Sequence, residues 1–218
     1  MTGLMLALSL LDGDSVIEVV ESFESRSYVK MTQKVQRAFG ADVRLGHNRI
    51  RIVGGKCYRS QSYAVEGDYS NAAFLDGFNL LGGGVKVIGL SPGTAQGDRV
   101  YQDFYRLICH GVNEFDLSDC PDLGPVMFAL AAALGGAKFT GTARLRIKES
   151  DRVAAMLEEL EKFGITASVG ENSVEIHPGE IRPPAKSLSG HNDHRIVMAL
   201  SLLCSKVGGT IDGAEAVA

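Results

Sequence analysis

One arrangement recurs four times along the chain and limits what it can fold into: an apolar helix of small residues, a glycine stop and a short β-branched strand. Its copies begin at Thr2, Ser70, Pro125 and Arg195. Glycine at a helix end adopts the left-handed conformation at little cost, and Val, Ile and Thr then favour a strand. The equivalent glycines lie 70, 53 and 73 residues apart, at Gly13, Gly83, Gly136 and Gly209. These repeats predict an α/β fold.

The first three copies are each followed by an amphipathic helix, over residues 28–39, 98–109 and 150–163. After the first and third of these helices, alternating apolar residues flank a tight turn, at Gly46-His47-Asn48 and at Gly170-Glu171-Asn172. Such a pattern is typical of a β-hairpin. The interval of 53 residues leaves room for only one strand in the middle copy. The predicted unit is therefore helix, strand, helix and hairpin, with the hairpin missing from the middle unit.

The composition excludes several classes of protein. With 218 residues, 45% hydrophobic and 22% charged, the chain resembles an ordinary soluble globular protein. A net charge of -4 excludes a global field that would attract nucleic acid, and the apolar stretches are too short to cross a membrane. The four cysteines show no CxxC spacing, so neither a zinc site nor a dense disulfide framework is predicted. Reduced thiols and a cytoplasmic location are expected.

Two charge-dense segments stand where helices are predicted to begin, Lys148-Glu149-Ser150-Asp151-Arg152 and Asn192-Asp193-His194-Arg195. Ordinary capping by Ser150, Asn192 or Asp193 is one interpretation, because Ser, Asn and Asp accept hydrogen bonds at helix starts. The basic residues oppose the helix dipole, at a cost of about 0.3 to 1 kcal/mol each when exposed. That cost is reasonable if an anion shares the site.

Three further junctions carry polar residues. Asp122 precedes an apolar helix and is either its N-cap or a general base. Asp68 is predicted to cap the helix that follows it. Ser25 and Tyr28 lie at the start of the first amphipathic helix, where hydroxyls and exposed amides can take a phosphate.

Motifs for nucleotide or metal cofactors are absent from the sequence: it has no GxxxxGK[ST] loop, no GxGxxG after a strand, no HExxH and no Ser-His-Asp elbow. The sequence therefore predicts no cofactor and no metal. His47, His110, His177 and Cys57 are assigned structural roles.

Five motifs, in order and spacing, resemble those of the 5-enolpyruvylshikimate-3-phosphate synthase family (3-phosphoshikimate 1-carboxyvinyltransferases). They are Glu66-Gly67-Asp68-Tyr69-Ser70, Gln96-Gly97-Asp98, Cys120-Pro121-Asp122 and the two charge-dense segments. The resemblance implies the enolpyruvyl transferase fold: two lobes, each of three βαβαββ-type units, with mixed sheets covered by helices. It also implies transfer of the enolpyruvyl group of phosphoenolpyruvate to the 5-hydroxyl of shikimate 3-phosphate, with release of phosphate, without a metal or cofactor.

The resemblance also implies roles for single residues. Asp122 matches the base that takes the 5-hydroxyl proton, and Lys148 matches a residue that binds substrate and moves protons. Glu149 matches the acid that protonates the phosphoenolpyruvate methylene. The remaining matches are substrate ligands: Arg152, His194 and Arg195 for phosphoenolpyruvate, and Ser25 and Tyr28 for shikimate 3-phosphate. Arg144 departs from the family, some members of which carry asparagine there.

The resemblance divides the chain into residues 1–66, the last unit of one lobe, and residues 67–218, most of the second lobe. The family's N-terminal phosphate-binding motifs would precede Met1, and a further phosphoenolpyruvate lysine would follow Ala218. The sequence is therefore expected to be a fragment that is weak or inactive by itself. Its expected partners are shikimate 3-phosphate, phosphoenolpyruvate, the candidate inhibitor glyphosate, and either the missing half or a second copy, with no nucleic acid and no membrane.

Two other functions remain open at this stage. The related UDP-N-acetylglucosamine enolpyruvyl transferases share the fold, but their usual loop cysteine has no clear counterpart here. A non-catalytic binding or dimerisation module derived from the synthase is the other alternative. The intact charged residues, from Asp122 to Arg195, argue against such decay.

Overall fold

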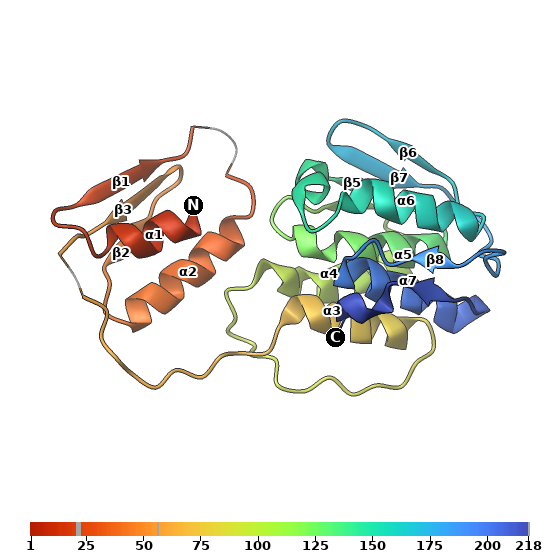
Figure 1. Cartoon of the computed structure of the whole chain (residues 1–218), viewed down its shortest axis with the longest axis horizontal. Helices are drawn as coiled ribbons and strands as arrows, with labels where there is room; N and C mark the ends of the chain where they lie inside the picture. Colours follow the sequence, from red (N-terminus) through yellow and green to blue (C-terminus); the bar gives the residue numbers. More distant parts are fainter. Residues whose placement is uncertain (21–22, 56, 218) are drawn as a thin grey trace. The chain divides into compact units, whose positions relative to one another are not determined.

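The computed structural model describes residues 1–20, 23–55 and 57–217 (Figure 1). The chain forms two compact units: unit 1 contains Met1–Gly67 and Ser91–Gly97, and unit 2 contains Asp68–Leu90 and Asp98–Ala218. Ser91–Gly97 belongs to unit 1 because the Thr94 hydroxyl donates to Glu66 (2.8 Å) and the Gln96 amide donates to the Gly67 carbonyl (2.8 Å). The assignment of residues 1–66 and 67–218 to two lobes of the family stays a prediction.

Unit 1 contains the predicted helix, strand, helix and hairpin. Its elements are α1 (Thr2–Leu8), β1 (Ser15–Glu18), α2 (Arg26–Ala38), β2 (Val43–Leu45) and β3 (Arg49–Ile52). The antiparallel sheet has the order β1-β3-β2, and in Figure 1 both helices lie on one side of it. The buried Gln36 joins the helices, since its amide donates to the Met5 carbonyl (2.7 Å) and to the Ser9 hydroxyl (3.1 Å).

Unit 2 contains the remaining elements. Its helices are α3 (Tyr69–Leu80), α4 (Tyr101–Cys109), α5 (Gly124–Leu134), α6 (Arg152–Lys162) and α7 (His194–Val207). Its strands are β4 (Glu114–Asp116), β5 (Ala137–Thr140), β6 (Ala167–Val169), β7 (Ser173–Ile176), β8 (Leu188–Ser189) and β9 (Ile211–Asp212). The described residues also form short 3-10 helices: η1 (Gly97–Val100), which begins at the last residue of unit 1, η2 (Pro121–Leu123), η3 (Ala143–Ile147) and η4 (Ala214–Val217).

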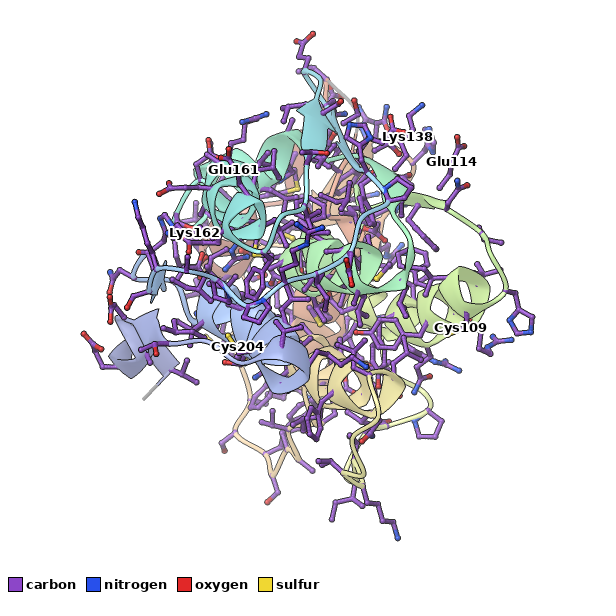
Figure 2. The ribbon with its side chains drawn as sticks, turned by 90° about the vertical axis from the view of Figure 1, so that its right-hand side faces the viewer. Cys109, Glu114, Lys138, Glu161, Lys162 and Cys204 are labelled. Atoms are coloured by element: carbon purple, nitrogen blue, oxygen red, sulfur yellow. The ribbon has the colours of Figure 1, made fainter. Side chains whose placement is uncertain are left out.

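The main sheet of unit 2 is mixed, with the order β4-β5-β7-β6. Strands β4 and β5 are parallel, and the predicted hairpin β6–β7 adds two antiparallel strands. Glu114 and Lys138 lie side by side on β4 and β5, as Figure 2 shows. The middle repeat supplies only β4, as its short interval predicts. The α/β class and the mixed sheets covered by helices are confirmed.

The core of unit 2 is organised around α5, which packs against α3, α4, α6 and α7. A helix surrounded in this way must be apolar on all sides. Accordingly, residues 124–132 of α5 are all buried. A glycine in the left-handed conformation ends the helix, as predicted, but it is Gly135 (φ 101°) rather than Gly136.

One predicted strand is wrong. Residues 85–90 form neither helix nor strand, and the glycine in the left-handed conformation after α3 is Gly82 (φ 103°) rather than Gly83. The Asn79 side chain forms two hydrogen bonds with the backbone of Val85: it accepts from the N–H (2.7 Å) and donates to the carbonyl (2.7 Å). Those groups are thereby withdrawn from sheet pairing. Val87 and Leu90 still pack against the core, whereas Ile88 remains 78% exposed.

Candidate active site

A cluster of charged side chains in unit 2 surrounds Arg152, the first residue of α6. Its side chain is 0% exposed. Nε donates to Asp193 Oδ2 (2.8 Å), Nη1 to Asp122 Oδ1 (3.0 Å) and Nη2 to Glu149 Oε2 (2.6 Å). Burial alone lowers the pKa of the guanidinium, but the bonds and charges of these carboxylates outweigh burial and raise it. Arg152 therefore organises three carboxylates from three separate segments.

Aspartates cap the two helices that carry the cluster. Asp151 Oδ1 accepts from the N–H groups of Val153 (3.1 Å) and Ala154 (3.0 Å) at α6, and Asp193 Oδ1 accepts from Arg195 N–H (3.0 Å) at α7. The predicted capping is thus confirmed for Asp193, which caps α7, and it is wrong for Ser150 and Asn192. The Ser150 hydroxyl donates instead to Asp193 Oδ2 (2.9 Å). The caps fix both helix starts, so the charged side chains project from rigid positions.

Asp122 does not cap α5. It lies in η2, and α5 begins without a side-chain cap bond. Its carboxylate instead faces three cations: Lys148 Nζ at 3.0 Å, Arg152 Nη1 at 3.0 Å and Arg195 Nη2 at 3.4 Å. Burial raises the pKa of Asp122, but the charges of Arg195, Lys148 and Arg152 outweigh burial and bring it below the ordinary value. Asp122 is therefore ionised at neutral pH, the state that a general base requires.

Arg195 carries a buried donor that the described residues leave unsatisfied. The residue is 7% exposed, and its Nη2 donates to the Ser70 hydroxyl (2.9 Å) and contacts Asp122. Its Nη1 is buried without a hydrogen-bond partner among the described residues. A buried unsatisfied donor costs about 1 to 3 kcal/mol, and more when charged. A carboxylate or phosphate oxygen is the acceptor that a guanidinium fits best, so this atom points to an anionic ligand.

The other predicted residues of unit 2 are more exposed. The side chain of Lys148 is 25% exposed, and that of Glu149, although bound to Arg152, is 51% exposed. His194 begins α7, with its side chain 36% exposed and Nδ1 at 3.9 Å from Asp193 Oδ1. The structure therefore brings Asp122, Lys148, Glu149, Arg152 and Arg195 into direct contact with one another through ion pairs, and His194 lies at their edge.

Ser25 and Tyr28 belong to unit 1. Ser25 immediately precedes α2 in the left-handed conformation (φ 53°) and makes no side-chain cap bond. It is 7% exposed, and its hydroxyl has no hydrogen-bond partner among the described residues. Tyr28 lies half-buried in the first turn of α2. Their role as ligands of shikimate 3-phosphate stays a prediction.

Sequence reasoning assigned no site role to three residues of this region. Ser70 bonds Arg195 from a position 125 residues earlier in the chain. Asp98, in the Gln96-Gly97-Asp98 motif, is 3% exposed, and burial followed by the charge of Asp122 raises its pKa to about 7. Glu159 is buried seven residues after Arg152, a spacing that places both on one face of α6. Only that spacing could have identified Glu159.

The raised pKa of Asp98 makes stability depend on pH. The folded chain keeps this proton to about pH 7, whereas the ordinary pKa is 3.8. The folded state therefore binds more protons in that interval, and the stability contributed by Asp98 is lost as pH rises from about 4 through about 7. Replacing Asp98 with Asn is expected to remove this loss. The stability advantage of Asp98→Asn over the unvaried chain should grow by more than about 1 kcal/mol between about pH 4.5 and about pH 7.5.

Urea unfolding at the two pH values measures this advantage. The exposed Asp103, changed to Asn on the neighbouring helix α4, is the matched control. An advantage of Asp98→Asn that does not change with pH would contradict the buried acid described here.

Among the described residues, no helix is both long and apolar enough to cross a membrane.

The whole chain, residues 1–218, matches the sequence profile of the family described as EPSP synthase (3-phosphoshikimate 1-carboxyvinyltransferase). It is 38% identical to the 3-phosphoshikimate 1-carboxyvinyltransferase of Clostridium kluyveri, covering 99% of this chain and 55% of that protein. It is 35% identical to the enzyme of the same name from Clostridium acetobutylicum, over 99% of this chain and 54% of that protein.

The fold is also that of a solved structure. EPSP synthase from Acinetobacter baumannii superposes with a TM-score of 0.77 at 24% identity, over 99% of this chain and 56% of that one. The chain thus spans about half the length of the curated relatives it matches. Its repeated α/β units, its ordered motifs and the match along its full length agree, and the chain belongs to the EPSP synthase (3-phosphoshikimate 1-carboxyvinyltransferase) family.

Proposed function

We propose that the cluster around Arg152 is the acid–base and anion-binding part of an enolpyruvyl transferase site. The reaction is transfer of the enolpyruvyl group of phosphoenolpyruvate to the 5-hydroxyl of shikimate 3-phosphate, with release of phosphate. The observation that carries the proposal is the buried Nη1 of Arg195, because a guanidinium donor that finds no partner among the described residues fits an anionic substrate. The names of the relatives support the choice of substrates.

In this proposal Asp122 is the base. Its low pKa leaves it ionised, and its three cationic neighbours hold it in place. Asp122 takes the proton of the 5-hydroxyl as that oxygen bonds to C2 of phosphoenolpyruvate. Glu149 supplies a proton to the methylene C3, which gives a tetrahedral intermediate. Glu149 then takes a proton back from C3 as the bond from C2 to the phosphate oxygen breaks, which releases phosphate and leaves the enolpyruvyl ether.

The geometry refines the role of Arg152. Its side chain is fully buried and already bonded to three carboxylates. An anion that reaches Arg152 must replace one of them, and Glu149 is the most exposed of the three. We therefore propose that phosphoenolpyruvate displaces Glu149 from Arg152, which frees Glu149 for proton transfer. Arg195 and Lys148 are the proposed contacts of the same anion, with His194 beside them.

The choice of acceptor tests this function. Phosphate release from phosphoenolpyruvate is measured with either shikimate 3-phosphate or UDP-N-acetylglucosamine as the acceptor. We expect release only with shikimate 3-phosphate, and at a low rate, because these 218 residues span about half of the relatives' length. Release that depends on UDP-N-acetylglucosamine would favour the related transferase. Release with neither acceptor, together with no binding of either substrate, would favour a non-catalytic module.

Two partners stay predictions. Glyphosate carries a carboxylate and a phosphonate, the groups that Arg195 and Lys148 are proposed to bind, so it is expected to compete with phosphoenolpyruvate. The remaining part of the family's length, or a second copy of this chain, is the expected protein partner.

A further inference from the structure

Glu159 is a buried carboxylate that the proposed chemistry does not use. It lies on α6, two helical turns after Arg152, and is 0% exposed. Lys162 Nζ donates to both of its oxygens (2.8 and 2.9 Å). The other two contacts come from the segment before α7: Ser189 N–H, at the end of β8, donates to Oε2 (3.0 Å), and His191 Nε2, in the loop that follows, lies 3.0 Å from Oε1. A buried carboxylate with this many hydrogen-bond partners holds the segments that carry those partners in place.

The loop that Glu159 holds is strained. His191 and Asn192 have φ values of 49° and 52°, in the left-handed region. Residues other than glycine adopt that region at a cost of up to about 1 to 2 kcal/mol each, and asparagine pays less of it than most. Such conformations persist only where surrounding contacts determine them. Besides Glu159, the loop is held by Gly190 N–H, which donates to the Asp212 carbonyl (2.7 Å).

The loop ends at Asp193, whose carboxylate binds the Arg152 side chain and caps α7, the helix that carries Arg195. The carboxylate accepts from Nε of Arg152 (2.8 Å) and from the backbone N–H of Arg195 (3.0 Å). Helix α6 therefore binds the segment before α7 at two points. Arg152 bonds to Asp193, and Glu159 bonds to Ser189 and His191. If the contacts of Glu159 are lost, the loop can change its backbone conformation, and Asp193 at its end can then move.

We propose that Glu159 is a positioning residue for the anion site: it holds the loop that aims Asp193 and, through it, Arg152 and Arg195. The inference rests on the proposed function for the nature of the anion. A metal site is the other interpretation, because Glu158, Glu159 and His191 bring ligand atoms within 4.8 Å of one another. Lys162 already neutralises Glu159, so the geometry favours positioning over cation binding.

Glu159→Gln tests the proposal in the 218-residue chain, because it preserves the side chain's size and removes its charge. The matched control is Glu161→Gln, an exposed glutamate on the same helix (Figure 2). Two quantities are measured below the unfolding transition: backbone hydrogen exchange of residues 188–196, and the affinity for inorganic phosphate. Glu159→Gln is expected to accelerate exchange in that segment and weaken phosphate binding, each by about tenfold or more, and the control should change neither.

A second variant guards against misfolding. His191→Ala removes one loop contact but leaves Glu159 paired with Lys162, and the His191 side chain is 23% exposed, so the fold should survive. It is expected to loosen the same segment to a smaller extent. A merely structural role would instead accelerate exchange throughout unit 2.

Unchanged exchange in residues 188–196, exchange that rises uniformly across unit 2, or unchanged phosphate affinity despite a loosened loop would each overturn the inference. Failure of the unvaried chain to bind phosphate would count against the proposed function, and exchange would still decide whether Glu159 holds the loop.

Discussion

Replacing Asp193 with Ala is expected to lower the free energy of unfolding by about 3 to 5 kcal/mol, the loss typical when one partner of a buried ion pair is removed. Asp193 and Arg152 both have side chains that are 0% exposed. Without Asp193, the Arg152 guanidinium keeps only Asp122 and Glu149, while Ser150 and the first turn of α7 lose an acceptor. The remaining buried charge makes the substitution costly.

Urea unfolding measures this loss, and a double variant isolates the pair. Asp193→Ala combined with Arg152→Met should be less destabilised than the sum of the two single variants, because no unpaired charge remains buried. Glu180→Ala, which removes a carboxylate from an exposed pair with Arg182, should change little. A loss below about 1 kcal/mol for Asp193→Ala would contradict the central position of this pair.

The second large effect concerns Asp122. Asp122→Asn preserves the side chain's size but removes the base, so phosphate release in the presence of both substrates is expected to slow by about 10²- to 10⁴-fold. The affinity for phosphoenolpyruvate should not weaken, because the carboxylate competes with an anion for Lys148 and Arg195. If Asp122 is the base, the rate of phosphate release falls while the affinity for phosphoenolpyruvate does not. If Asp122 only helped to bind the substrate, the affinity would fall as well.

Single-turnover measurements with protein in excess over phosphoenolpyruvate suit this chain, because its turnover is expected to be slow. The exposed Asp119, changed to Asn three residues earlier, is the matched control and should keep the unvaried rate. A rate that Asp122→Asn leaves within about threefold of the unvaried chain would remove Asp122 from the role of base.

Local rules predict much of the fold. The glycine stop after α5, the hairpin tips and the cap of α3 by Asp68, whose carboxylate accepts from Ser70 N–H (2.8 Å), all depend on residues close in sequence. The strand predicted in residues 85–90 fails because Asn79 captures the backbone of Val85. A pattern of β-branched residues cannot reveal such a competing side chain.

The site is less predictable, because its geometry joins distant parts of the chain. The ordered motifs identify the charged residues, but they show neither that Arg152 is fully buried nor that Asp122 faces three cations instead of capping α5. The bond between Ser70 and Arg195 joins residues 125 positions apart. Pairings of this kind depend on how α3, α6 and α7 pack, which follows from the whole core rather than from any local sequence signal.

The most direct test of the proposed site is calorimetric titration of the 218-residue chain with phosphoenolpyruvate, in the presence of shikimate 3-phosphate. One molecule should bind per chain. Arg195→Gln removes the buried donor that has no partner in the described part of the chain, and it should weaken binding by about 30-fold or more. Arg182→Gln, which changes an exposed arginine in the same unit, should leave binding unchanged. Absence of binding by the unvaried chain, or binding that Arg195→Gln does not weaken, would contradict an anion site at the start of α7.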